Sequence, residues 1–98
     1  MNAISKRAHE VTPPGSSVLL YGSQARGDAR PGSDWDILLL LDKDDITSAD
    51  HDNYIYPLRA LGWDIGAIIN PIAFTKAQWD ANSYTPFHKN VEADAITL

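Results

Sequence analysis

The 98-residue sequence contains no cysteine, and this absence removes several kinds of site at once. Disulfides, thiolate zinc sites and cysteine nucleophiles are all excluded. The longest uninterrupted apolar run covers residues 37–41, which is far too short to span a bilayer. Lys6 and Arg7 lie near the start with no apolar segment after them, so no signal peptide is expected. A cytoplasmic protein that does not act in a membrane fits these absences.

Positive charge is also scarce. There are 8 Lys and Arg residues against 13 Asp and Glu residues, and the net charge is −5. Strong nucleic-acid binding by this chain alone is not expected, because that affinity comes from cations placed on phosphates. A small metal-bound nucleotide or a basic protein partner suits the charge better.

The chain is short, and we expect residues 1–98 to form one domain. Alternating helical and β-rich segments predict an α+β (α/β) fold, in which helices pack mainly on one face of a small mixed sheet. Pro57 should kink or split the third helix, Gly62 should end it, and Pro71 should close the third strand. The expected helices cover residues 3–11, 24–29, 47–61, 76–79 and 86–92, and the expected strands cover residues 16–21, 34–41, 64–70 and 95–98.

The most chemically informative stretch is residues 19–41, which begins with a strand and a Gly22-Ser23 turn. A glycine between a strand and a helix lets the backbone approach a phosphate, and the first turn of the helix offers unpaired N–H groups. Arg26, one turn further on, could reach the same anion. A plain strand–helix turn is the alternative interpretation, since such glycine turns are common.

Two carboxylates follow in the same stretch. Side chains alternate along a strand, so Asp34 and Asp36 share one face, whereas Trp35 points to the other and is expected to pack in the core. Two unpaired acids would repel each other, and divalent cations with oxygen ligands remove that repulsion. The pair therefore predicts a Mg²⁺ site, with two ions if it performs phosphoryl chemistry. The alternatives are a solvated turn and a phosphatase with Asp34 as nucleophile, in which the glycine turn has no role.

Taken together, these residues resemble a family signature. Gly22-Ser23, residues 25–28 (ARGD) and Ser33-Asp34-x-Asp36 follow one another as in the minimal nucleotidyltransferases of the DNA polymerase β-type superfamily. The resemblance implies a nucleotidyltransferase core that binds ATP or another NTP through Gly22, Ser23, Arg26 and Ser33. It also implies that Asp34 and Asp36 hold Mg²⁺. Members often act as the antitoxin beside a HEPN-domain toxin, to which they transfer AMP on tyrosine.

The superfamily uses a third carboxylate on a neighbouring strand. Asp64 is the only acid in the expected third strand, so it is the candidate for this third catalytic and metal-binding residue. If Asp64 instead lies at an exposed strand end, the third ligand is missing. The chain would then be a nucleotidyltransferase-like binding module that neutralises its partner by occlusion. In either case, a partner or a homo-oligomer is expected to complete the site.

Overall fold

The computed structural model describes residues 2–98 and contains, within them, a four-stranded sheet of order β3-β2-β1-β4. Its strands are β1 (Ser17–Tyr21), β2 (Trp35–Leu41), β3 (Ile69–Thr75) and β4 (Ile96–Thr97). β1 runs antiparallel to both β2 and β4, whereas β2 and β3 are parallel. The predicted fold class, a small mixed sheet with helices, is confirmed.

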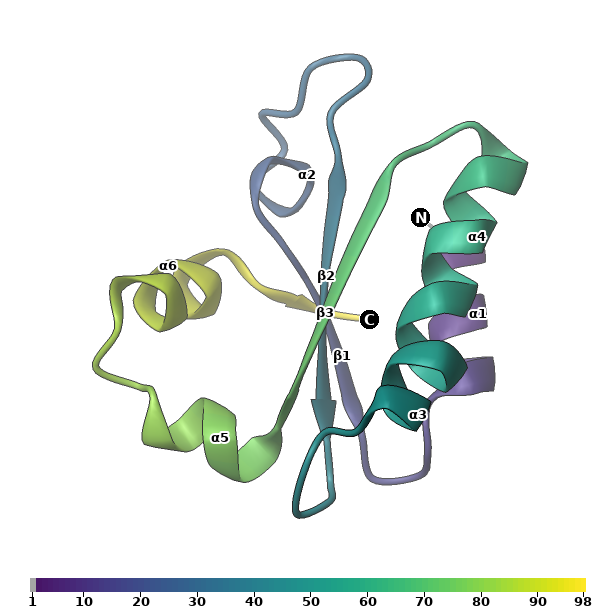
Figure 1. Ribbon diagram of the computed structural model, residues 1–98. Helices are drawn as coiled ribbons and strands as arrows, with labels where there is room; N and C mark the ends of the chain where they lie inside the picture. The colour runs from purple at the N-terminus through teal and green to yellow at the C-terminus, as the bar shows by residue number, and fades with distance from the viewer. Residues whose placement is uncertain (1) are drawn as a thin grey trace.

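Helices lie on both faces of this sheet rather than mainly on one (Figure 1). One face carries α1 and α4, and the other carries α5 and α6, whereas α2 follows the end of β1 and packs Ala25 against the first of these clusters. The reason is that β2 buries side chains on both faces, including Ile37 and Leu39 on one and Leu38 on the other. The helical elements are α1 (Asn2–Val11), α2 (Ser23–Arg26), α3 (Ser48–Asp50), η1 (His51–Ile55), α4 (Tyr56–Ile65), α5 (Lys76–Ala81) and α6 (Pro86–Asp94).

The helix predicted over residues 47–61 is split, as expected near Pro57. A short α-helix, α3, is followed by the π-helical turn η1 and then by α4, in which Pro57 occupies the first turn. Ile55 and Leu58 are buried on the predicted apolar stripe. Tyr54 and Leu61 pack against the same core cluster.

The predicted end of this helix is wrong. α4 continues past Gly62 to Ile65 and stops at Gly66, which adopts the left-handed conformation with φ 71°. Gly62 lies inside the helix because its missing side chain leaves room for the backbone: a Cβ there would lie 2.7 Å from the Ala67 carbonyl oxygen. Asp64 is therefore a helical residue.

The predicted third strand is also displaced. β3 begins at Ile69 and runs through Pro71 to Thr75, instead of covering residues 64–70. A proline is tolerated here because β3 is an edge strand, where a missing N–H costs no ladder hydrogen bond. The shift changes which polar residue lies beside the acids of β2.

Both predicted helix starts near the end of the chain are confirmed. The Thr75 hydroxyl accepts from the Gln78 N–H, and the Gln78 side chain accepts from the Thr75 N–H, both at 3.0 Å. Thr85 caps α6, with Pro86 in its first turn. The expected terminal strand is present as the short β4. Of the helices in residues 2–98, none is long and apolar enough to cross a membrane.

Candidate functional site

Three polar side chains meet where β1 ends and β2 and β3 begin. Asp36 lies opposite Tyr21 in the antiparallel register and beside Asn70 in the parallel register. The Asn70 amide nitrogen donates to a carboxylate oxygen of Asp34 at 2.7 Å. The structure therefore brings together the two predicted acids, on the sheet face that also carries α5 and α6.

Gly22 directly follows β1 and lies against Asp36. Its backbone has φ 76° and ψ −158°, a conformation that is essentially restricted to glycine. A Cβ at this position would lie 2.5 Å from a carboxylate oxygen of Asp36. The Gly22 carbonyl accepts the N–H groups of Ala25 and Arg26, each at 3.1 Å, and so begins α2, whose first residue is Ser23. The glycine turn and the acids thus form one unit.

The electrostatics of this unit favour a bound cation. Burial raises the pKa of Asp36, and the negative charge of Asp34 raises it further, against the opposing effects of Asn70 and Arg26. Burial and the Asp36 charge also raise the pKa of Tyr21 to about 12. Negative charge is therefore costly here, and a cation at the acids would lower that cost.

Arg26 is engaged with carboxylates. Its guanidinium donates to Asp94 at 2.8 Å and to Asp28 at 3.1 Å, and these hydrogen bonds raise its pKa above the ordinary value. The contact to Asp94 ties α2 to the last residue of α6. A role for Arg26 in nucleotide binding stays a prediction.

Ser33 holds the loop between α2 and β2. Its hydroxyl accepts from the Arg30 N–H at 2.9 Å, and its carbonyl accepts from the Gln24 side chain at 3.2 Å. These bonds fix the segment that delivers Asp34 to the site. A contact between Ser33 and the nucleotide stays a prediction.

Asp64 does not join the acids. It lies exposed in the last turn of α4, and within residues 2–98 no group of three Asp, Glu, His or Cys side chains could hold a metal. Sequence reasoning missed Asn70, which occupies the neighbouring strand instead. A strand predicted to begin after Gly66 would have indicated Asn70, because Asn70 is then the first polar residue beside Asp36.

The donor set fits a hard divalent cation. Asp34 and Asp36 offer carboxylate oxygens, and a half-turn of the Asn70 amide would add a neutral oxygen. Mg²⁺ in proteins is commonly held by one or two carboxylates together with waters and substrate phosphates. These three residues would therefore suffice to hold one such ion when a nucleotide supplies the remaining ligands.

A cavity of about 540 Å³ lies between two loops beside the acids. Trp35 lines it together with the loop after α2 and the loop before β3, and neither acid belongs to its lining. Because Trp35 and Asp36 point to opposite faces of β2, this cavity is not the floor of the acid site.

Comparison with protein families gives a match over nearly the whole chain. Residues 2–94 match the nucleotidyltransferase domain family. The chain belongs to this family. The resemblance inferred from residues 22–36 is thereby confirmed, and a catalytic role for Asp34 and Asp36 stays a prediction.

A solved structure described as the crystal structure of a toxin–antitoxin with AMP-PNP shares the fold of this nucleotidyltransferase domain. The TM-score is 0.67 at 18% sequence identity, over 98% of this chain and 69% of that chain. Comparison with curated proteins gives no match.

Proposed function

We propose that the protein transfers a nucleoside monophosphate, AMP from ATP, onto a hydroxyl group in a Mg²⁺-dependent reaction. The observation that carries the proposal is the acid pair Asp34 and Asp36, of which Asp36 packs against Gly22, in a nucleotidyltransferase domain. The acceptor we propose is a tyrosine of a HEPN-type toxin, for which this chain would act as a cytoplasmic antitoxin. The toxin–antitoxin with AMP-PNP that shares the fold supports this choice.

In the proposed reaction, the acceptor oxygen forms a bond to the α-phosphorus and the bond from that phosphorus to pyrophosphate breaks. The acceptor proton passes to one carboxylate of the acid pair. Gly22 leaves the space that the Asp36 carboxylate occupies. Asp34 and Asp36 would hold a Mg²⁺ ion, which would supply charge neutralisation for the triphosphate and the departing pyrophosphate. Such transfer depends mainly on positioning and charge neutralisation.

Transfer of label from α-labelled ATP to the HEPN-type partner tests the proposal. We expect label on the partner with Mg²⁺ present, and loss of at least a hundredfold in rate for Asp34→Asn and for Asp36→Asn. Asp64→Asn is the matched control, because it removes an exposed carboxylate outside the site. Unchanged transfer in both acid variants, or transfer without Mg²⁺, would contradict the proposal.

A second candidate function is inhibition of the partner by binding alone. It is favoured by Asn70, which provides a neutral amide on the neighbouring strand where a third carboxylate would complete the acid set. The double variant Asp34→Asn/Asp36→Asn separates the two functions. Retained neutralisation of the partner by the folded double variant supports binding alone, and lost neutralisation supports transfer.

A further inference from the structure

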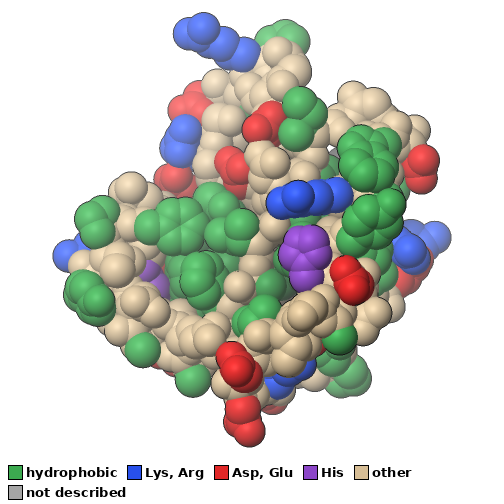
Figure 2. All heavy atoms as spheres, in the orientation of Figure 1, with side chains coloured by type: hydrophobic (Ala, Val, Ile, Leu, Met, Phe, Trp, Pro, Cys, Tyr) green, Lys and Arg blue, Asp and Glu red, His purple; other side chains and the backbone are tan. Residues whose placement is uncertain are grey.

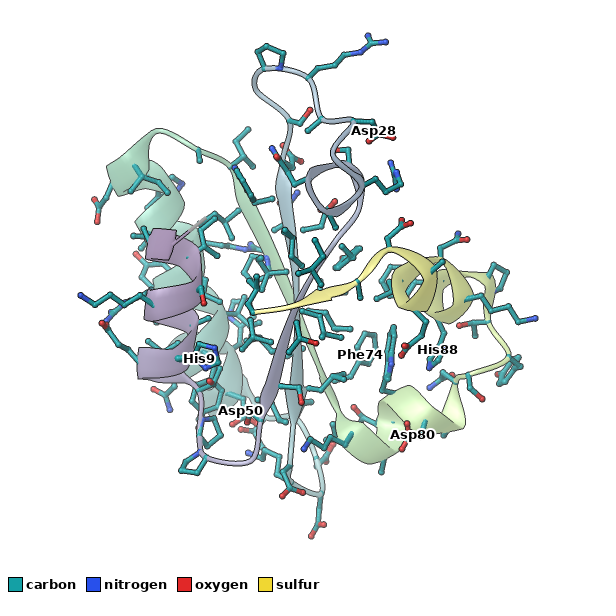
Figure 3. All side chains as sticks on the ribbon, turned by 180° about the vertical axis from the view of Figure 1, so that it is seen from behind. His9, Asp28, Asp50, Phe74, Asp80 and His88 are labelled. Carbon is teal, nitrogen blue, oxygen red and sulfur yellow. The ribbon has the colours of Figure 1, made fainter. Side chains whose placement is uncertain are left out.

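An apolar cavity opens on the same face of the sheet as the acids. It has a volume of about 230 Å³ and is lined by Phe74, Trp79, Asn82, Thr85 and Phe87. We refer to it as the aromatic cavity. Figure 3 shows Phe74 projecting from β3 toward α5 and α6. In Figure 2, hydrophobic side chains gather over these two helices, with acidic side chains at the upper border of the patch.

The walls of the aromatic cavity are held in fixed orientations. Trp79 packs against Phe74 and Phe87, with ring centroids 5.7 and 5.9 Å apart. The Trp79 indole N–H donates to Glu92 at 2.9 Å, and the His88 ring stacks on the indole at 4.3 Å. Phe87 nevertheless leaves 42% of its surface exposed. Phe87 thus offers an exposed aromatic ring that is already ordered by its contacts with Trp79 and Tyr21, which lowers the entropic cost of binding a ring.

The aromatic cavity and the acid site lie on the same face of the sheet. Asn70 and Phe74 point to the same face of β3 and lie roughly 13 Å apart at four strand residues. On β1, Tyr21 lies opposite Asp36 in the register and packs edge-to-face on Phe87 at 5.8 Å. Tyr21 therefore contacts the cavity wall while lying next to Asp36, so an extended molecule on this face would reach from the acids to the cavity.

We propose that the aromatic cavity binds the nucleobase of the nucleotide whose phosphates lie at Asp34 and Asp36. This inference rests on the proposed function. Pockets that enclose a whole drug-sized ligand measure about 300–1,000 Å³, so the smaller cavity suits a single ring system. No Lys or Arg lines it, which argues against a phosphate site there. The Asn82 amide nitrogen donates to the Gln78 carbonyl at 2.7 Å, so the Asn82 side-chain oxygen is the group offered to the edge of a base.

Calorimetric titration with two probes, Mg²⁺·AMP-PNP and Mg²⁺·tripolyphosphate, tests the inference. Stacking of one base on aromatic side chains corresponds to roughly tenfold in affinity, so we expect AMP-PNP to bind at least that much more tightly. Phe87→Leu keeps an apolar side chain but removes the aromatic face, and should abolish this advantage without changing the affinity for tripolyphosphate. The matched control is Tyr84→Leu, because Tyr84 is 75% exposed and does not line the cavity.

Equal affinities of the wild-type protein for the two probes would overturn the inference. Unchanged AMP-PNP binding by Phe87→Leu would also overturn the inference, even if that variant no longer bound the protein partner. In either case, tripolyphosphate binding that still required Asp34 and Asp36 would not contradict the proposed function. Absence of acid-dependent binding of either probe would overturn both. A thermal melt of each variant verifies that it is folded.

Discussion

At the scale of single residues, the site depends on Gly22, which contributes space rather than a functional group. Replacing Gly22 by alanine forces a Cβ to within 2.5 Å of a carboxylate oxygen of Asp36 and strains the backbone. We expect Gly22→Ala to cost roughly 3 kcal/mol of unfolding free energy and to abolish Mg²⁺·AMP-PNP binding. Chemical denaturation and calorimetry measure the two effects.

Gly32→Ala is the control for that substitution. Gly32 also has a positive φ, of 83°, but a Cβ there would meet nothing within 4 Å. It should therefore cost only about 1–2 kcal/mol and leave nucleotide binding intact. Equal loss of binding in the two variants would mean that backbone strain, and not displacement of Asp36, is responsible.

Asn70 provides a second prediction at this scale. Asn70→Asp places a third carboxylate beside Asp34 and Asp36, so without metal it should lower stability by about 1–2 kcal/mol through charge repulsion. The same change adds an anionic ligand and should raise Mg²⁺ affinity at least tenfold. Asn90→Asp, an exposed substitution on α6, has the same charge change and should do neither. Titration with Mg²⁺ and denaturation in EDTA measure both quantities, and unchanged Mg²⁺ affinity would contradict the prediction.

The sequence located Gly22, Asp34 and Asp36 because strand alternation and a glycine turn are local properties. It could not locate the partners of Arg26. Asp94, which accepts its hydrogen bond, lies 68 residues away, and nothing local to either residue indicates the contact. Asn70 was missed for a different reason, because its place beside Asp36 depends on where β3 begins.

At the scale of elements, the sequence did not locate the boundary between α4 and β3. Gly62 and Gly66 are both plausible helix stops, and only tertiary packing separates them. Gly62 is buried against the chain that leaves the helix, whereas Gly66 is exposed and takes the left-handed conformation. Pro71 suggested a strand end, but a proline on an edge strand does not interrupt pairing with the inner strand.

The start of α3 supplies a pH-dependent prediction. Asp50 is buried, accepts two hydrogen bonds from Lys43 at 2.7 Å and one from the Thr47 N–H at 2.8 Å. The Lys43 interaction holds the pKa of Asp50 below its ordinary value of 3.8. Folding therefore gains stability from the ionised group above that value and loses it as the pH falls through the lower, folded-state pKa.

Asp50→Asn should accordingly cost about 2 kcal/mol at pH 7. The difference between wild type and variant should shrink as the pH falls from 3.8, where the carboxyl of the unfolded chain takes up its proton, through the lower pKa of the folded chain. Denaturation curves between pH 7 and pH 2.5 give the two free energies. Asp52→Asn, an exposed acid in the adjacent turn, is the control. A constant difference over the whole range would show that ionisation of Asp50 contributes nothing.

At the scale of the whole molecule, a chain of 98 residues has modest stability, so ligands that bind only the folded state should increase its stability measurably. Mg²⁺·AMP-PNP at a hundred times its Kd should add about 2.7 kcal/mol to the unfolding free energy. EDTA should remove this gain if the acids bind the nucleotide through the metal. Thermal melts with and without EDTA measure the effect, and equal stabilisation in both conditions would contradict metal-dependent binding.

The strand order also places β3, with its seven residues, at one edge of the sheet. Within residues 2–98, no neighbouring strand pairs with the outer side of β3. Such an edge is a template on which a second chain can add a strand and begin aggregation. Pro71 lies near the middle of β3 and has no N–H to offer to an incoming strand. Pro71, whose presence in the sequence suggested a strand end, thus disfavours pairing of β3 with another copy of the molecule.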